Sequence, residues 1–119
     1  MSHPVFNTIE DEYPDHDIIR AGKHEFIVEL EPGKAIAWIG PGGSRPHFHL
    51  EMVETYRVLE GRLSVAVGGV GWVLKEGEQL RIGAPRIHVA ASASLDGSWA
   101  KVQVLSDPPW SAEDHFHVG

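Results

Sequence analysis

Short apolar runs, broken every few positions by glycine or proline, make up most of the chain. In two of them apolar residues alternate with others, as the trios Phe26, Val28, Leu30 and Leu63, Val65, Val67. A period of two places every member of a trio on one face of a β-strand, and we expect both faces to be buried. No segment has a capped helical pattern of ten or more residues.

This pattern predicts an all-β fold with little or no helix. The expected strands are residues 24–31, 34–40, 47–50, 55–60, 62–67, 71–74, 79–82, 87–92 and 98–105. The turn-type sequences EPGK, VGGVG, KEG and SLDG connect several of them, and their Gly, Pro and Asp residues suit tight turns. Short strands at such spacing are typical of a sandwich or barrel.

The length of 119 residues indicates a single domain. The expected organisation is an N-terminal arm over residues 1–22, a barrel over 23–107 and a C-terminal tail over 108–119. The acidic arm shows little periodicity, so it either lies across the barrel or a partner subunit, or is a disordered tail. The Pro pair and acidic residues of the ending suggest an exposed tail, and a ligand role for its His115 and His117 is improbable.

Composition narrows the classes of partner. Lys and Arg number 10 against 17 Asp and Glu, and the resulting charge of -7 would repel a nucleic-acid backbone. The first residues do not read as a signal peptide, and no apolar run is long enough to span a bilayer, so we expect a cytoplasmic protein without membrane contact. Cysteine is absent. Any metal must therefore be held by His, Asp or Glu.

Four residues could hold such a metal ion. On a strand, His47 and His49 would project to the same face about 7 Å apart, with Phe48 packing on the opposite face. Glu54 follows after four residues, which is enough for a tight reversal into the next strand. His88 comes after a Gly-Ala-Pro turn, where a side chain can enter the mouth of a barrel. A His-x-His pair alone is weak support, because such pairs also occur by chance.

The stretch PGGSRPHFHLEMVETYRVLEG resembles the first cupin motif, G-x5-H-x-H-x(3 or 4)-E-x6-G. Its three ligand positions and final glycine fall on His47, His49, Glu54 and Gly61. GEQLRIGAPRIHVAAS resembles the second motif, G-x5-P-x-G-x2-H-x3-N, through Gly77 and His88. Three positions depart from this second pattern, namely Gly83, Pro85 and Ser92, where the family has Pro, Gly and Asn. Gly and Pro are exchanged here, so we expect a turn with a different backbone path at the barrel mouth, while the histidine is retained.

The resemblance implies a double-stranded β-helix, or jelly-roll barrel, whose interior holds one divalent metal ion on His47, His49, Glu54 and His88. Such a ligand set suits Fe, Mn, Ni, Zn, Co or Cu and does not choose among them. Alternatives are a barrel that binds no metal or one that binds it only for structure. Compact cupins commonly pair, so a homodimer is expected.

Two residues are candidate catalytic groups. Alternation from Glu54 brings Tyr56 to the same face, where its phenol could carry a proton, although a core aromatic would occupy the same place. Arg86 shares a face with His88 and could clamp a carboxylate or phosphate at the mouth, with Arg45 a weaker candidate for that role.

Three functions remain open at this stage. The first is isomerase, epimerase or lyase chemistry on a small polar or anionic metabolite, such as a sugar or keto acid, as in the mannose-6-phosphate isomerase-like group of cupins. The second is a non-haem iron dioxygenase. The third is a non-catalytic module that binds a small-molecule ligand.

Overall fold

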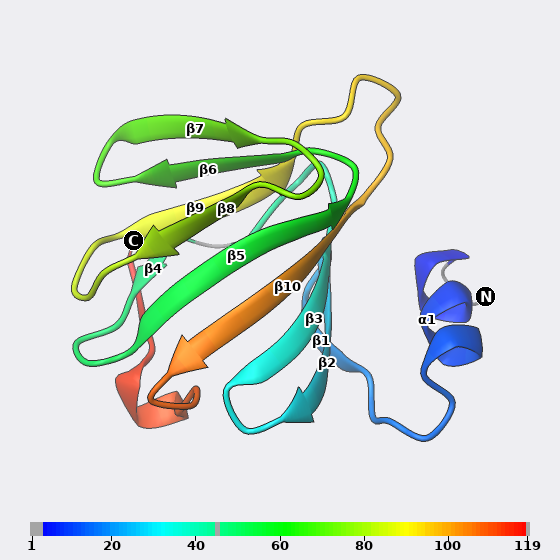
Figure 1. Cartoon of the computed structure of the whole chain (residues 1–119), viewed down its shortest axis with the longest axis horizontal. Coiled ribbons are helices and arrows are strands. Elements are labelled where there is room, and N and C mark those ends of the chain that lie inside the picture. Colours follow the sequence, from blue (N-terminus) through cyan, green and yellow to red (C-terminus); the bar gives the residue numbers. More distant parts are fainter. Residues whose placement is uncertain (1–3, 45, 119) are drawn as a thin grey trace.

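The computed structural model describes residues 4–44 and 46–118, and its strands form two antiparallel sheets that face each other (Figure 1). Along the chain the elements are α1 (Pro4–Glu12), β1 (Ile19–Gly22), β2 (Glu25–Glu31), β3 (Lys34–Ile39), β4 (His47–Phe48), β5 (Val53–Glu60), β6 (Leu63–Val67), β7 (Val70–Leu74), β8 (Gln79–Ile82), β9 (His88–Ser92), β10 (Ala100–Asp107), the 3-10 helix η1 (Ala112–Asp114) and β11 (Phe116–His117). Within the described residues no helix has the length and apolar character needed to cross a membrane.

The mostly-β prediction is confirmed, with 49% of residues in strands and 11% in helices. All nine expected strands are present, each with bounds within two residues of those predicted. One sheet has the order β1-β2-β3-β10-β5-β8 and the other the order β11-β4-β9-β6-β7. Non-consecutive strands lie side by side in both sheets, as expected for a jelly-roll barrel.

The main core fills the space between the two sheets. The predicted inward trio of β6, Leu63, Val65 and Val67, is buried there. It packs with residues of the opposite sheet that include Val58 of β5 and Val102 of β10. These two sets of side chains hold the sheets together, since apolar burial is the main favourable contribution to such a fold.

A second core lies on the outer face of β2 and β3, under α1 (Figure 1). Ile9 of the helix is fully buried there against Phe26, Val28, Ile36 and Trp38. Phe26 and Val28 of the β2 trio are thus buried and Leu30 is partly buried, but beneath the helix and not inside the barrel. The hydrophobic pattern did not predict α1, because the nine residues of this helix fall short of a capped helical repeat.

The C-terminal segment folds back onto the barrel, while most of its side chains stay exposed. Ser111 caps η1 by accepting a hydrogen bond from the backbone N–H of Glu113. After η1, β11 pairs antiparallel with β4, and Phe116 stacks on Phe48 with ring centroids 5.2 Å apart. The pairing places the tail beside the strand that carries His47.

Candidate metal centre

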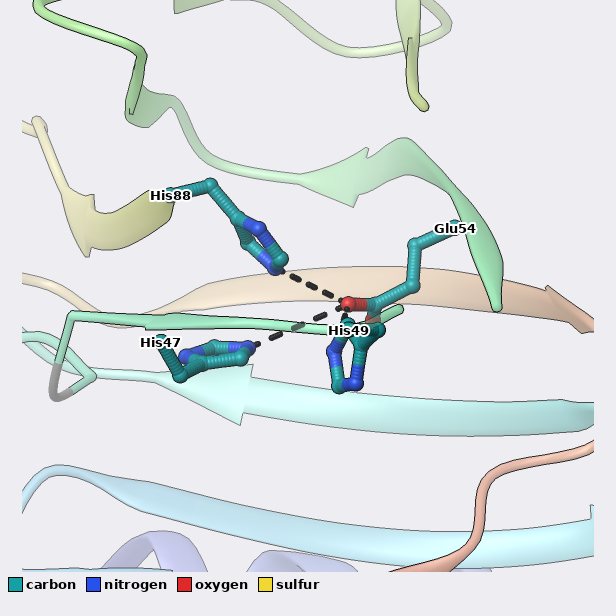
Figure 2. Close-up of side chains that lie close together, drawn as sticks. All are labelled: His47, His49, Glu54 and His88. Atoms are coloured by element: carbon teal, nitrogen blue, oxygen red, sulfur yellow. Dashed lines mark hydrogen bonds and ion pairs between the residues drawn. The ribbon is translucent and has the colours of Figure 1, made fainter. Parts of the chain in front are cut away.

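Four buried polar side chains meet inside the barrel, at the positions predicted from the sequence (Figure 2). His47 lies on β4 and His49 directly after it, while Glu54 lies near the start of β5 and His88 begins β9. The pairing of β4 with β9 sets His47 opposite His88. The loop between His49 and β5 then turns the chain so that Glu54 enters from the other sheet.

The geometry of this cluster centres on one carboxylate oxygen. Oε1 of Glu54 lies 2.8 Å from Nε2 of His49, 2.9 Å from Nε2 of His88 and 3.9 Å from Nε2 of His47 (Figure 2). One ligand atom from each of the four residues lies within 4.8 Å of every other. Three imidazole nitrogens and a carboxylate oxygen at this separation are compatible with coordination of a single transition-metal ion.

Backbone carbonyls orient two of the imidazole rings. Nδ1–H of His49 donates to the carbonyl oxygen of Asp114 at 2.5 Å, and Nδ1–H of His88 donates to that of Arg86 at 3.1 Å. In the neutral rings Nε2 then carries a lone pair that points at the Glu54 carboxylate. Such lone pairs repel a carboxylate unless a cation lies between them, either a proton that Nε2 donates to Glu54 or a metal ion. The donor set therefore fits a divalent metal ion, with second-sphere hydrogen bonds of the usual kind.

The pKa shifts of Glu54 and His49 arise from the same close contacts between the carboxylate and the imidazoles. Burial alone would raise the pKa of Glu54, but its close contacts with the imidazoles of His47, His49 and His88 hold that pKa well below its usual value. Burial alone would lower the pKa of His49, yet hydrogen bonds to the Glu54 carboxylate and the Asp114 carbonyl outweigh it and raise that pKa. The site thus favours an ionised carboxylate beside a cation.

A cavity of about 640 Å³ opens onto the cluster. His47, His49 and Glu54 are among its lining residues, so a ligand in the cavity could reach the metal position. Side chains of β2, β3 and β10 form much of the remaining wall. A volume of this size is typical of small-molecule sites.

Of the two candidate catalytic residues, Tyr56 lies at the cavity and Arg86 does not line it. Tyr56 is buried and lines the cavity, with its ring centroid 6.1 Å from that of His88. Burial, followed by the carboxylates of Glu54 and Glu25, raises the pKa of its phenol well above the usual value. Arg86 is exposed and is not among the described lining residues, so only its backbone carbonyl serves the site. Arg45 lies outside the described residues.

Several residues of the C-terminal segment belong to the site although the sequence did not predict this, among them Asp114, His115 and His117. The carboxylate of Asp114 accepts hydrogen bonds from the backbone N–H groups of Leu50 at 2.7 Å and Met52 at 2.9 Å, in the loop between two ligands. His115 stacks on His47 with centroids 4.6 Å apart. Burial and then the neighbouring histidines lower the pKa of His115 to about 4.

Glu25 was also missed. It lines the cavity from the start of β2, and burial is the main cause that raises the pKa of its carboxyl. In the sequence its alternation with Phe26 was a usable signal, because it places Glu25 on the face opposite the outer core. What the sequence lacked was any sign that this opposite face borders the metal position.

Comparisons with known proteins agree with the architecture. No family model matches the sequence, and no curated protein matches it. Among solved structures, the capsular polysaccharide assembling protein CapF from Staphylococcus aureus superposes with a TM-score of 0.73 at 10% identity, over 87% of this chain and 32% of that one. Oxalate decarboxylase from Bacillus subtilis gives a TM-score of 0.67 at 18% identity, over 89% of this chain and 31% of that one.

A Streptomyces protein of similar size, Pac13, gives a TM-score of 0.64 at 14% identity and covers 88% of this chain and 86% of its own. This chain spans about a third of the CapF and oxalate decarboxylase chains. At such identities the likeness concerns the fold. The fold is that of cupin β-barrel proteins, as the two motifs implied.

Proposed function

We propose that the chain is a divalent-metal-dependent enzyme that moves a proton on a small molecule held in the barrel. The observation that carries the proposal is the convergence of His47, His49, Glu54 and His88 at a cavity large enough for a substrate. A structural metal site usually has four protein ligands and no open position. This site also has four candidate ligands, but it borders a cavity from which a small molecule could reach the metal. When bound, the metal would supply Lewis-acid polarisation of a carbonyl or hydroxyl oxygen.

Two side chains of the cavity can handle the proton. The raised pKa of Tyr56 keeps its phenol protonated at neutral pH, so it acts as a hydrogen-bond donor to a developing oxyanion. The carboxyl of Glu25 lies on the same cavity, outside the ligand cluster, and its raised pKa moves it toward the range useful for a general base or acid. In this assignment Glu25 takes the proton and Tyr56 steadies the oxygen.

This assignment fits isomerisation, epimerisation or elimination, all of which begin with proton removal beside a polarised oxygen. Pac13, which matches most of this chain in fold, is described as a nucleoside dehydratase, and dehydration is an elimination. The compact size of the barrel favours the mannose-6-phosphate isomerase-like group within the cupins. Arg86 would act on a substrate only from outside the cavity lining, so the proposal gives it no part in proton transfer.

Deuterium incorporation tests the proposal without knowledge of the product. Metal-loaded protein is incubated in D₂O with a panel of small hydroxy ketones, keto acids and aldoses, and exchange at carbon is followed by NMR. We expect at least one compound to exchange with the native chain and none with the His47→Ala, His49→Ala double variant.

Each alternative function has a distinct outcome in the same samples. Oxygen uptake with Fe(II) and no carbon-bound deuterium would indicate a dioxygenase and overturn the proton-transfer proposal. Ligand binding with neither exchange nor oxygen uptake would indicate a non-catalytic binding module, and would overturn the enzyme proposal.

A further inference from the structure

The cavity carries information about the ligand that the metal cluster does not. We infer that it takes a neutral, largely apolar molecule that presents one oxygen-rich head group to the metal position. This inference rests on the proposed function and names the substrate class for it. It departs from the anionic sugar or keto acid suggested by the sequence.

The apolar side of the cavity arises from the alternation of β3. Ala35, Ala37 and Ile39 line the cavity, whereas Ile36 and Trp38 point the other way into the core under α1. Successive residues of a strand face opposite sides of the sheet, so the helix side takes the large residues and the cavity side takes the two alanines. The small alanine side chains leave space inside the barrel where larger ones would fill it.

Neighbouring strands extend this surface across the sheet. Ala37 lies opposite Ile27 of β2, and Ala35 lies opposite Val104 of β10. Ile27 and Val104 also line the cavity. We call these five residues the apolar wall: Ile27, Ala35, Ala37, Ile39 and Val104.

The charges around the apolar wall are unfavourable for an anion. The described lining residues include three carboxylates, those of Glu25, Glu29 and Glu54. Among the same described residues the sole Lys or Arg is Lys23, which is exposed. A phosphate or a second carboxylate away from the metal position would therefore lose its hydration without gaining a bidentate cationic partner.

Several polar groups lie at the metal end of the cavity, whereas Glu29, which pairs with Ala35 of the apolar wall, is exposed to solvent. Tyr56 lies beside the ligands, and Trp110 lines the same cavity while its indole N–H donates to Nδ1 of His115 at 3.1 Å. An apolar wall with a few polar groups at one end is the usual pattern of a site that orients a small ligand by its head. The geometry thus separates a head-group region from a body region.

A matched series of hydroxamic acids tests this division, because all members share one metal-binding head. Acetohydroxamic acid has almost no body, benzohydroxamic acid has a neutral aromatic body, and 4-carboxybenzohydroxamic acid has a charged one. Binding to the metal-loaded protein is measured by calorimetry. We expect benzohydroxamic acid to bind at least tenfold more tightly than either of the others.

Two leucine variants separate the wall from the metal. Ala35→Leu narrows the cavity, and Ala66→Leu is its control, because Ala66 is a partly buried residue of β6 outside the described lining. In Ala35→Leu, benzohydroxamic acid should bind no more tightly than acetohydroxamic acid, whose own affinity should equal that for the native chain. Ala66→Leu should bind all three hydroxamic acids with the same affinities as the native chain.

A neutral fluorophore, N-phenyl-1-naphthylamine, probes the wall after the metal has been removed with a chelator. We expect its fluorescence to rise with the native chain and with Ala66→Leu, and at least fivefold weaker binding to Ala35→Leu. Equal dye binding by the two variants, or binding of the carboxylated hydroxamate as tight as that of the neutral one, would overturn the inference.

The proposed function fails separately. If acetohydroxamic acid does not bind and the protein holds no metal, the proposed metal-dependent activity is rejected. The dye comparison, which uses metal-free protein, still decides whether the apolar wall selects neutral apolar molecules.

Discussion

The backbone carbonyl of Asp114 accepts a hydrogen bond of 2.5 Å from Nδ1–H of His49, a residue 65 positions earlier in the chain. The side chain of Asp114 meanwhile holds the loop that leads from His49 to Glu54. Burial opposes ionisation, but the backbone N–H groups of that loop keep the pKa of this carboxyl below its usual value. Asp114 therefore ties the C-terminal segment to two of the metal ligands.

We predict that Asp114→Ala weakens metal binding. Without its carboxylate the loop at Leu50 to Met52 loses its hydrogen-bond acceptor, and the carbonyl that orients His49 is released with it. Changes to such outer partners typically cost about 10- to 100-fold in metal affinity. Competition with a chromogenic chelator measures the affinity, and Glu113→Ala, at the exposed neighbouring position, is the control. An affinity unchanged in Asp114→Ala would rule out this positioning role.

Glu25→Gln should lower the rate of deuterium exchange while metal content stays at the native level. The substitution keeps the size of the side chain and removes its ability to take a proton, and a general base contributes about 10²- to 10⁴-fold to such rates. Glu29→Gln is the matched control, because Glu29 lines the same cavity from the same strand but is exposed. Equal rates in the two variants would remove Glu25 from the mechanism.

The helix α1 should contribute to the stability of the barrel. Ile9→Ala removes a fully buried side chain from the outer core and should lower the free energy of unfolding by about 2–4 kcal/mol. Glu10→Ala, at an exposed position of the same helix, should change it by less than about 0.5 kcal/mol. Urea unfolding followed by tryptophan fluorescence measures both. If Ile9→Ala lowers the free energy of unfolding as little as Glu10→Ala does, α1 is not docked on the sheet in solution.

We also predict a homodimer that uses the edge strand β7. This strand ends its sheet, and Val70, Trp72 and Val73 on it are each about half exposed, at 57%, 49% and 60%. Exposed apolar edges are commonly covered by a partner. Sedimentation should show a dimer for the native chain and a monomer for Val73→Lys, with equal metal content. A native monomer would exclude this arrangement.

The sequence predicted the parts of the structure that depend on local pattern. Alternation and turn residues located nine strands, and motif spacing brought His88 to the other three ligands although 34 positions separate it from Glu54. It missed β1 and β11 because both strands are short, and because β11 also depends on pairing with the distant strand β4. The role of Asp114 and the place of Glu25 beside the metal position follow from the closure of the barrel, which no local pattern records.

The metal site is tested most directly by elemental analysis of protein purified without added metal, compared with the His47→Ala, His49→Ala double variant. We expect about one divalent transition-metal ion per native chain and almost none in the double variant, because the variant removes two of four ligands. Equal metal content in the two proteins, or none in either after incubation with Fe(II), Mn, Co, Ni, Cu or Zn, would contradict the site.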